Sequence, residues 1–426
     1  MVDYHPFYLH LTLIMLKRNI VQNLEDALAD SPVILLNGAR QTGKSTLVQW
    51  MTSNGYDLEY LTMDDATVFE AVQKDSTAFL KGLSKSVVLD EIQRVPELFI
   101  PIKASVDRDR RPGRFILTGS ANIFMLPKLS ESLAGRMEIQ TLWPLSQGEI
   151  LGRKETFIDF IFSNQAFNLT LPKLDKNGLF EKILLGGFPE VISRSTANRR
   201  MAWFNSYLTT ILQRDVRDIS NIQGLTSLPR LLSLLSARAG TLVNFAEIST
   251  NMGIPQTTLK RYMTLFETTF MVHMIMPWSE NLSKRLIKTP KLYLCDTGLS
   301  FYLQGFTIDK LHQNPMVAGQ LVENFVALEI LKQQTWNQTQ TKLYHFRTAA
   351  GQEVDFLLED MQGNIVGIEV KSSETVQGKD FKTLEMLQAE LGNRFHKGIV
   401  LYAGKDLVAF GPKLWAVPIQ TLWEIY

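Results

Sequence analysis

The sequence contains few residues that cross-link a chain or chelate a metal. Cys295 is the one cysteine among 426 residues, which excludes an internal disulfide framework and a zinc ribbon. It lies in an apolar, strand-like run at 292–295, so we expect a buried thiol and not a nucleophile. The six histidines are scattered without metal-ligand spacing. A chain that needs no disulfide fits a reducing compartment, and we predict a cytoplasmic protein.

An excess of one charge and long apolar runs are also absent. The 44 basic and 43 acidic residues give a net charge of +1, so any polyanion site must be local. No apolar run reaches the length of about 20 residues that spans a membrane, and no membrane partner is expected. Residues 4–16 are apolar, but Asp3 replaces the basic lead of a signal peptide. We interpret residues 1–20 as a leader of open status, in which Met15 is an alternative start.

A glycine-rich segment, GARQTGKS at residues 38–45, follows an apolar run that predicts a buried parallel strand. Such a turn points backbone N–H groups inward, and the following helix N-terminus adds partial positive charge, so we expect it to cradle the phosphates of ATP. Lys44 is predicted to reach the β- and γ-phosphates and Ser45 to ligate Mg2+. The alternative is a glycine turn with an incidental lysine. The predicted nucleotide-binding residues are Gly38, Ala39, Arg40, Gln41, Thr42, Gly43, Lys44, Ser45, Thr46, Asp90 and Ser120.

A second apolar run, 86–89, ends in two carboxylates. Asp90 is predicted to bind the Mg2+ through its water shell, and Glu91 to polarise a water for attack on the γ-phosphorus. That pattern is typical of a hydrolase, and the alternative is a helix cap. A third strand, 114–119, leads to Thr118, Ser120 and Asn122, any of which could sense the γ-phosphate.

Arg136, in the segment LAGR at 133–136, is a candidate for neutralising charge that develops during phosphoryl transfer. A surface or structural role fits it equally well.

The strands expected in the first part of the chain are 33–37, 58–62, 86–90, 114–119 and 137–142, alternating with helical segments. This pattern predicts an α/β fold with a parallel sheet and helices on both faces, and a ligand at the carboxyl ends of the strands. The whole chain is predicted to be multi-domain. The expected divisions are the P-loop ATPase domain at 21–147, a helical lid at 148–224, a winged helix-turn-helix domain at 225–304 and an α/β restriction-endonuclease-like domain at 305–426.

The helix-turn-helix is predicted from 245–253, a helix with its glycine turn, and from a second helix that begins at 255–262. Leu259, Met263 and Phe266 are expected in the core. Thr258, Lys260, Arg261 and Tyr262 are expected to face solvent or a groove. A basic stretch at 283–291, with Lys284 and Arg285, predicts a positively charged wing. DNA contact follows if these charges meet phosphates, whereas docking of a protein partner remains the alternative.

The C-terminal part carries a separate set of charged residues. Glu323 lies on an amphipathic helix at 319–330, and the alternating segments 353–358 and 367–371 are expected to pair as neighbouring strands. If the register aligns them, Asp355 and Glu369 converge with Glu323 on a divalent cation, and Lys371 activates the attacking water. That is a phosphodiesterase layout. The alternative is a set of cross-strand ion pairs on an exposed sheet.

These motifs resemble those of AAA-like P-loop ATPases of bacteria and archaea with a largely uncharacterised C-terminal region. The resemblance is carried by GARQTGKST, SVVLDEIQ, FILTGSAN, SESLAGR, LCDTGL, GQEVDFLLE and IEVKSS, between residues 37 and 373. It implies Mg-ATP binding at Lys44, Ser45 and Asp90. It also implies a tail similar to the restriction-endonuclease superfamily, with Asp355, then Glu369 and Lys371. The sequence departs from that pattern because no proline precedes Asp355, and Arg136 is not equated with an arginine finger.

Two functions are consistent with this arrangement. In the first, a cytoplasmic ATPase couples its nucleotide state to a winged helix and a nuclease-like domain that acts on DNA. In the second, ATP binding is a switch, and the C-terminal part only recruits a protein or DNA partner. A nucleotide-gated toxin or defence component is a third possibility. The oligomeric state stays open.

Overall fold

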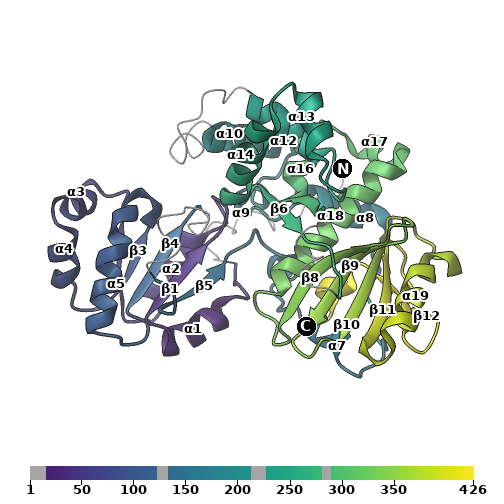
Figure 1. The fold of residues 1–426 in the computed structure, drawn as a ribbon, viewed down its shortest axis with the longest axis horizontal. Coiled ribbons are helices and arrows are strands. Elements are labelled where there is room, and N and C mark those ends of the chain that lie inside the picture. Colours follow the sequence, from purple (N-terminus) through teal and green to yellow (C-terminus); the bar gives the residue numbers. More distant parts are fainter. Residues whose placement is uncertain (1–15, 122–132, 213–226, 281–288) are drawn as a thin grey trace, which may run out of the picture.

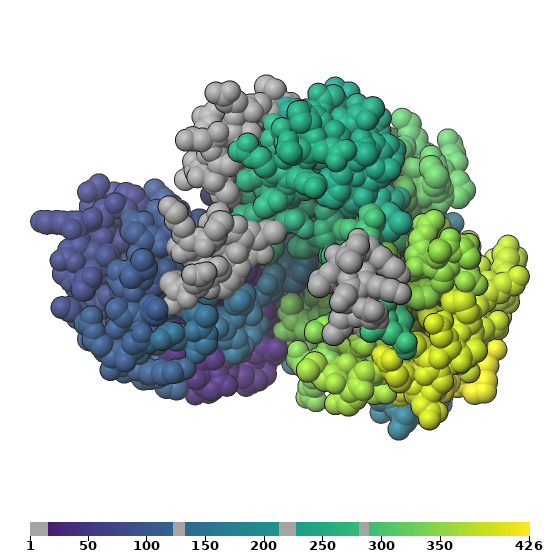
Figure 2. Space-filling model, in the orientation of Figure 1, coloured from purple at the N-terminus to yellow at the C-terminus, as the bar shows by residue number. Residues whose placement is uncertain are grey.

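The computed structural model describes residues 16–121, 133–212, 227–280 and 289–426. Figure 1 shows an N-terminal lobe in purple and blue, a helical lobe in teal and a C-terminal lobe in green and yellow. In Figure 2 the N-terminal lobe projects to one side of the other two. No helix within the described ranges is both long and apolar enough to cross a membrane.

The N-terminal lobe contains a five-stranded sheet of order β2-β3-β4-β1-β5, in which every pair is parallel. The predicted strands are confirmed, with ends that differ by no more than one residue. Strand β1, which lies between β4 and β5, is buried along its whole length, as its run of apolar side chains requires. The strands are β1 (Val33–Asn37), β2 (Leu58–Thr62), β3 (Ser86–Asp90), β4 (Phe115–Gly119) and β5 (Met137–Thr141).

Helices cover both faces of this sheet. One face packs against α1 (Val21–Asp30) and α2 (Lys44–Ser53), and the other against α3 (Ala66–Lys74), α4 (Ser76–Gly82) and α5 (Phe99–Arg108). Alternate residues of β1 point into the two clusters, since successive side chains of a strand face opposite ways. The predicted doubly covered parallel sheet is therefore present, and its carboxyl edge carries the candidate nucleotide site.

The interval predicted as a helical lid, residues 148–224, contributes to two different hydrophobic clusters. Helices α7 (Phe157–Phe162) and α8 (Lys176–Leu185) pack in the cluster of the C-terminal sheet, whereas α9 (Pro189–Ile192) and α10 (Ala197–Thr210) pack with the helical lobe. A short helix, α6 (Gln147–Leu151), precedes them and begins with a complete capping box at Ser146 and Glu149.

The helical lobe contains α13 (Phe245–Met252) and α14 (Gln256–Thr268), joined at Gly253 in the left-handed conformation. Lys260 and Arg261 are exposed on α14, but Tyr262 is buried, so its predicted outward position was wrong. Tyr262 follows Arg261 directly, and at this position the side chain falls on the face of α14 that packs into the core. Lys284 and Arg285 lie outside the described residues. The other elements are α12 (Leu228–Ser236), α16 (Thr297–Gln304) and the antiparallel strands β6 (Val272–Ile275) and β7 (Lys291–Leu294). The short helix α17 (Ile308–Gln313) packs through Leu311 in the cluster of the C-terminal sheet.

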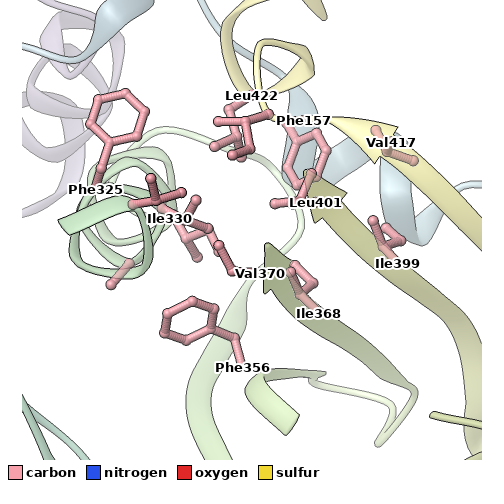
Figure 3. Packing of buried hydrophobic residues seen from close by; sticks show 14 of the residues in the cluster. Phe157, Phe325, Ile330, Phe356, Ile368, Val370, Ile399, Leu401, Val417 and Leu422 are labelled. Carbon is pink, nitrogen blue, oxygen red and sulfur yellow. The ribbon is translucent and has the colours of Figure 1, made fainter. Parts of the chain in front are cut away.

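The C-terminal lobe is a mixed six-stranded sheet of order β12-β13-β11-β10-β9-β8. Helix α18 (Pro315–Gln333) packs on one face with α7 and α8, and α19 (Lys382–Leu391) packs on the other. Figure 3 shows Phe325 and Ile330 of α18 over the apolar side chains of the sheet. The remaining elements are β8 (Thr341–Arg347), β9 (Glu353–Asp360), β10 (Ile365–Lys371), β11 (Phe395–Tyr402), β12 (Val408–Ala409), β13 (Leu414–Pro418) and α20 (Thr421–Glu424). The predicted pairing of β9 with β10 is confirmed, and it is antiparallel.

Candidate functional site

The glycine-rich segment has the backbone of an anion cradle. Gly38, Gln41 and Gly43 all have positive φ, at 141°, 63° and 92°. A Cβ on Gly38 would lie 2.2 Å from the carbonyl oxygen of Leu142, so this position has no room for a side chain. Helix α2 begins directly after Gly43. The first amides of that helix have no partner within the helix, and they point toward the loop as an anion site requires.

Lys44 is buried inside this loop. Its Nζ donates to the carbonyl oxygens of Gly38, at 2.9 Å, and of Ala39, at 2.8 Å. Thr42 closes the turn by donating its hydroxyl to the same Ala39 oxygen, at 3.0 Å. The ammonium group is therefore held at the mouth of the cradle by backbone oxygens, which are weaker partners than phosphate oxygens.

Asp90, at the end of β3, collects three hydroxyl groups. Its carboxylate accepts from Ser45 Oγ at 3.1 Å, from the Tyr60 hydroxyl at 2.6 Å and from Thr118 Oγ1. Burial, and then the hydrogen bond to Asp90, raise the pKa of Tyr60, so the tyrosine remains a donor. The sequence did not reveal Tyr60, because nothing in its local pattern separates it from an ordinary strand tyrosine.

Glu91 is held in a strained backbone conformation, with φ of 59°. Its amide donates to Thr118 Oγ1 at 3.1 Å. The Gln93 side-chain amide donates to Glu91 Oε2 and, at 3.0 Å, to Ser120 Oγ. Thr118 therefore hydrogen-bonds to both Asp90 and Glu91, whereas Ser120 is linked to Glu91 through Gln93. Asn122 lies outside the described residues. Gln93 was not among the residues that the sequence singled out.

Arg136 lies at the amino-terminal ends of the parallel strands, whereas the cradle lies at their carboxyl ends. It immediately precedes β5, whereas the cradle follows the carboxyl end of the neighbouring parallel strand β1. Its Nε pairs with Asp107 Oδ1 of α5 at 2.5 Å, and this hydrogen bond lowers the pKa of Asp107. Five strand residues at about 3.3 Å each separate the two ends. Arg136 therefore lies too far from the cradle to contact a nucleotide bound by its own chain, and its predicted catalytic role within one chain does not fit this structure.

Arg18, in the interval interpreted as a leader, is part of the site. Its guanidinium donates to Glu149 Oε1 at 3.0 Å, to the Thr42 carbonyl of the cradle at 2.8 Å and to the Trp143 carbonyl at 2.7 Å. Residues 18–20, the last part of the interval interpreted as a leader, are buried and belong to the fold. On the other side of the cradle, the Tyr207 hydroxyl of α10 donates to the Arg40 carbonyl at 3.3 Å.

The Arg18 contact continues into the C-terminal lobe. Glu149 lies on α6, and the amide of Gln147 on the same helix donates to Glu329 Oε2 of α18 at 2.9 Å. Glu329 Oε1 accepts from Lys332, which also donates to the Leu145 carbonyl at 2.9 Å. We call residues Arg18, Glu149, Gln147, Glu329 and Lys332 the joint. It connects the cradle to α18 through buried polar contacts.

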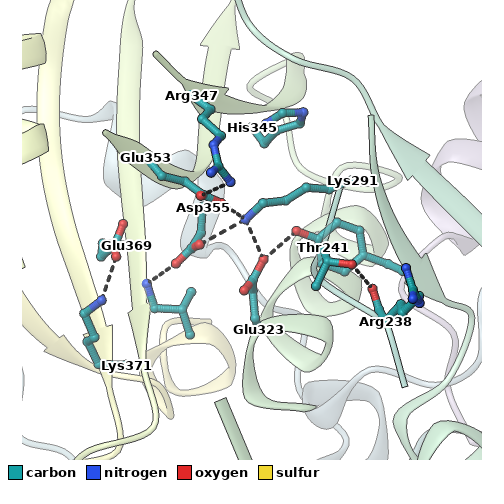
Figure 4. A network of polar contacts seen from close by, with 12 residues as sticks. Arg238, Thr241, Lys291, Glu323, His345, Arg347, Glu353, Asp355, Glu369 and Lys371 are labelled. Carbon is teal, nitrogen blue, oxygen red and sulfur yellow. Dashed lines mark hydrogen bonds and ion pairs between the residues drawn. The ribbon is translucent and has the colours of Figure 1, made fainter. Parts of the chain in front are cut away.

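Lys291 lies at the centre of the charged residues of the C-terminal lobe, as Figure 4 shows. Its Nζ is 3.0 Å from Glu323 Oε1, 2.6 Å from Glu353 Oε1 and 3.2 Å from Asp355 Oδ1, and its side chain is 2% exposed. Burial opposes its charge, but the Glu323, Asp355 and Glu353 carboxylates outweigh burial and raise its pKa. Lys291 was predicted to add exposed positive charge to a winged hairpin. It does lie on a hairpin strand, β7, but its charge is buried and compensated by carboxylates, so the predicted exposed charge was wrong. We call Lys291, Glu323, Glu353 and Asp355 the lysine cluster.

Glu323 also accepts from the Tyr293 hydroxyl, at 2.7 Å. Burial and the nearby Asp355 carboxylate raise the pKa of Glu323 to about 8. Glu353 is shared with Arg347, whose NH1 lies 3.1 Å from Glu353 Oε2. The two cations Lys291 and Arg347 therefore face the three carboxylates of Glu323, Glu353 and Asp355.

Asp355 lies where the strand pairing is irregular. Two steps along β8, from Tyr344 to Phe346, correspond to three steps along β9, so β9 contains a bulge. The bulge turns the Asp355 side chain toward Lys291, and its Oδ2 accepts from the Val370 amide at 2.9 Å.

Glu369 pairs with Lys371, 2.7 Å apart, and lies beside the lysine cluster. Burial, followed by the Asp355 carboxylate, raises the pKa of Glu369 to about 8. Within the described ranges, no group of three or more His, Cys, Asp or Glu side chains is arranged to hold a metal ion. The predicted metal ligands Glu323 and Asp355 instead share an ammonium, because Lys291 already fills the space between them.

Comparison with known proteins identifies relatives over most of the chain. The uncharacterized protein Rv2008c of Mycobacterium tuberculosis is 31% identical over 362 residues, which are 84% of this chain and 74% of the relative. The uncharacterized protein Mb2031c of Mycobacterium bovis matches equally. The chain belongs to their family.

Family models match three regions of this chain. Residues 30–151 match an AAA domain, the class of P-loop domain that binds and hydrolyses ATP. Residues 176–310 and 318–422 match two domains of unknown function, DUF8612 and DUF4143. Among solved structures, the RuvB Holliday junction branch migration motor of Thermotoga maritima aligns with 60% of this chain and 88% of its own length, at 18% identity and a TM-score of 0.29.

The AAA domain thus contains the cradle, Asp90 and Glu91, which the motifs had predicted. The joint connects the AAA domain to the region of residues 318–422, and the lysine cluster connects that region to residues 176–310. These contacts join segments far apart in the sequence, such as Arg18 and Glu149, which are 131 residues apart.

Proposed function

We propose that the chain is a Mg2+-dependent ATPase that transmits its nucleotide state to the two C-terminal regions. The observation that carries this proposal is the convergence of the Ser45 hydroxyl, 3.1 Å from Asp90, beside the buried Lys44 ammonium. A hydroxyl and a carboxylate are hard oxygen ligands of the kind that magnesium prefers, and the ammonium lies where phosphate charge would enter. When bound, magnesium would neutralise phosphate charge.

The chain's own residues then take distinct roles. Lys44 exchanges two backbone carbonyls for phosphate oxygens, and the amides of residues 38–46 bind the remaining charge. Glu91 orients and polarises the attacking water. Gln93 and Ser120 position the Glu91 carboxylate, and Tyr60 positions Asp90. A nucleotide in the cradle therefore changes the partners of residues that also touch the joint.

The nucleotide state is proposed to reach the rest of the chain by two contacts with the cradle itself. Arg18 donates to the Thr42 carbonyl and to Glu149 of the joint, and Tyr207 of α10 donates to the Arg40 carbonyl. Both contacts use backbone oxygens of the loop that must adjust around phosphates. This favours a switch, in which ATP binding and turnover change how the helical and C-terminal lobes are held.

For the helical lobe we propose a winged helix-turn-helix that contacts DNA through Lys260 and Arg261. Both side chains are exposed on α14, the second helix of the pair, and local positive charge is sufficient for phosphate attraction. For the C-terminal lobe we propose a restriction-endonuclease-like fold, from Asp355, Glu369 and Lys371 on β9 and β10, that binds a partner. A protein partner at the same surfaces is the alternative.

ATP turnover in the presence of Mg2+ tests the enzymatic part. Wild type should release phosphate from ATP. Lys44→Ala should lose turnover and most nucleotide affinity, while Glu91→Gln should still bind ATP but turn it over at least 100-fold more slowly, as expected of a general base. Lys85→Ala is the matched control, because Lys85 is an exposed lysine of the same domain. Unchanged turnover in Lys44→Ala would refute the proposal.

DNA affinity as a function of salt concentration tests the helix-turn-helix. Lys260→Glu with Arg261→Glu should weaken binding and flatten its salt dependence. Lys379→Glu with Lys382→Glu is the control, since it makes the same charge change at two exposed positions, one just before α19 and one at its first residue. Equal effects from both pairs would mean that net charge, and not this helix, determines affinity.

A further inference from the structure

The carboxylates that the sequence assigned to a divalent metal already have a cation. Lys291 enters from β7 of the helical lobe, whereas Glu323 comes from α18 and Glu353 and Asp355 from β9. Lysine is rarely buried unless it is paired, and this one is 2% exposed with three carboxylate partners. The charge of the lysine cluster is therefore compensated within the chain.

The oxygens of the cluster are already engaged by protein donors. Glu323 Oε1 accepts from Lys291 and from the Tyr293 hydroxyl, at 2.7 Å. Asp355 Oδ1 accepts from Lys291, and its Oδ2 from the Val370 amide. A divalent ion needs several oxygens at about 2.0–2.6 Å around one point. Here that point is taken by Nζ, so the residues do not fit a resident metal.

We propose that Lys291 is the permanent cation of this site, and that the lysine cluster is a clasp between the helical and C-terminal lobes in place of a metal-dependent nuclease centre. This proposal is independent of ATP hydrolysis. A lysine side chain is tied to its strand, so it joins two parts of the chain in a way that a diffusible ion cannot. Lys371 is 32% exposed and pairs with Glu369 of its own strand, so this pair joins no two parts of the chain.

Mn2+ binding to the full chain without nucleotide tests the first half of the proposal. The measurement is an electron paramagnetic resonance titration that counts bound Mn2+ in wild type and in Asp355→Asn. We expect equal stoichiometry, because Asp355 binds no metal while Lys291 is present. Mn2+ bound at the nucleotide site contributes equally to wild type and to Asp355→Asn, so it does not affect the difference between their stoichiometries. A Mn2+ ion that wild type binds and Asp355→Asn does not would overturn the proposal.

Removal of the ammonium tests the second half. Lys291→Met leaves three carboxylates without their cation, so the midpoint of thermal unfolding should fall by at least about 5 °C. It should also create one new Mn2+ site, whose occupation raises the midpoint again and which disappears in Lys291→Met with Asp355→Asn. Lys371→Met is the matched control and should do neither. A midpoint for Lys291→Met no lower than that of Lys371→Met would refute the clasp.

If Lys291→Met yields no folded protein, Glu353→Gln decides instead. It removes one of the charged partners of Lys291 and keeps the ammonium, so it should lower the midpoint more than Glu359→Gln, which affects a longer pair with the more exposed Arg394. An equal or smaller loss in Glu353→Gln would refute the clasp.

Discussion

Replacing Arg18 with methionine should destabilise the folded chain by about 3 kcal/mol, the lower end of the range for breaking a buried ion pair. The side chains of Arg18 and Glu149 are 7% and 1% exposed, and the guanidinium makes two further bonds to carbonyl oxygens. The lower end applies because the Glu149 carboxylate keeps the amides of Asn19 and Ser146 as donors. The aliphatic stem of methionine retains much of the packing, so the loss is mainly electrostatic.

A double-mutant cycle separates the pair from its surroundings. The free energies of urea unfolding are compared for wild type, Arg18→Met, Glu149→Gln and the double variant, and we expect a coupling of about 2 kcal/mol. The exposed pair Lys85 and Asp57, whose side chains are 61% and 85% exposed, is the control, with an expected coupling under about 0.5 kcal/mol. A coupling for Arg18 and Glu149 no larger than the control would show that the joint adds nothing to stability.

Three further outcomes are expected. Gly38→Ala should abolish ATP binding and lower the unfolding midpoint, because its Cβ would meet the Leu142 carbonyl at 2.2 Å, whereas Gly82→Ala, which meets nothing within 4 Å, should do neither. Burial raises the pKa of Glu155 to about 8, so this carboxyl group takes up a proton on folding. The free energy of unfolding should therefore fall as pH rises from about 4.5 to 8. Glu155→Gln should flatten that pH dependence, and an unchanged slope would contradict the assignment. Arg136→Ala should leave ATP turnover unchanged in chains diluted to the monomer, and a large loss there would contradict its placement away from the cradle.

The elements that the sequence predicted well are those whose signal is local. The strands of the AAA domain are short apolar runs, and their ends are marked by polar residues, such as Asp90 at the end of β3. The cradle has a fixed spacing that depends on backbone conformation within eight residues. Cys295 was expected to be buried, and it is. These features needed no knowledge of distant contacts.

The parts that escaped prediction are contacts between segments far apart in the chain. Arg18 meets Glu149, 131 residues away, and nothing near residue 18 indicates a partner. Lys291 resembled one more basic residue of a hairpin, because local sequence cannot show that three carboxylates surround it. Tyr262 was misplaced for a related reason, since a tyrosine fits both a solvated face and a core. The sequence indicated which residues carry charge but not which charges meet.

Helix α18 carries two residues of the joint, Glu329 and Lys332, and one residue of the lysine cluster, Glu323. Glu323 and Glu329 are six residues apart, about 9 Å along the axis, and they point in different directions around it. A small tilt of the helix would barely displace either end over so short a span. Sliding along the axis or turning about it, by contrast, would move both carboxylates at once and by the same amount. An axial displacement of α18 that begins at Glu329 would therefore move Glu323, the partner of Lys291, by the same distance.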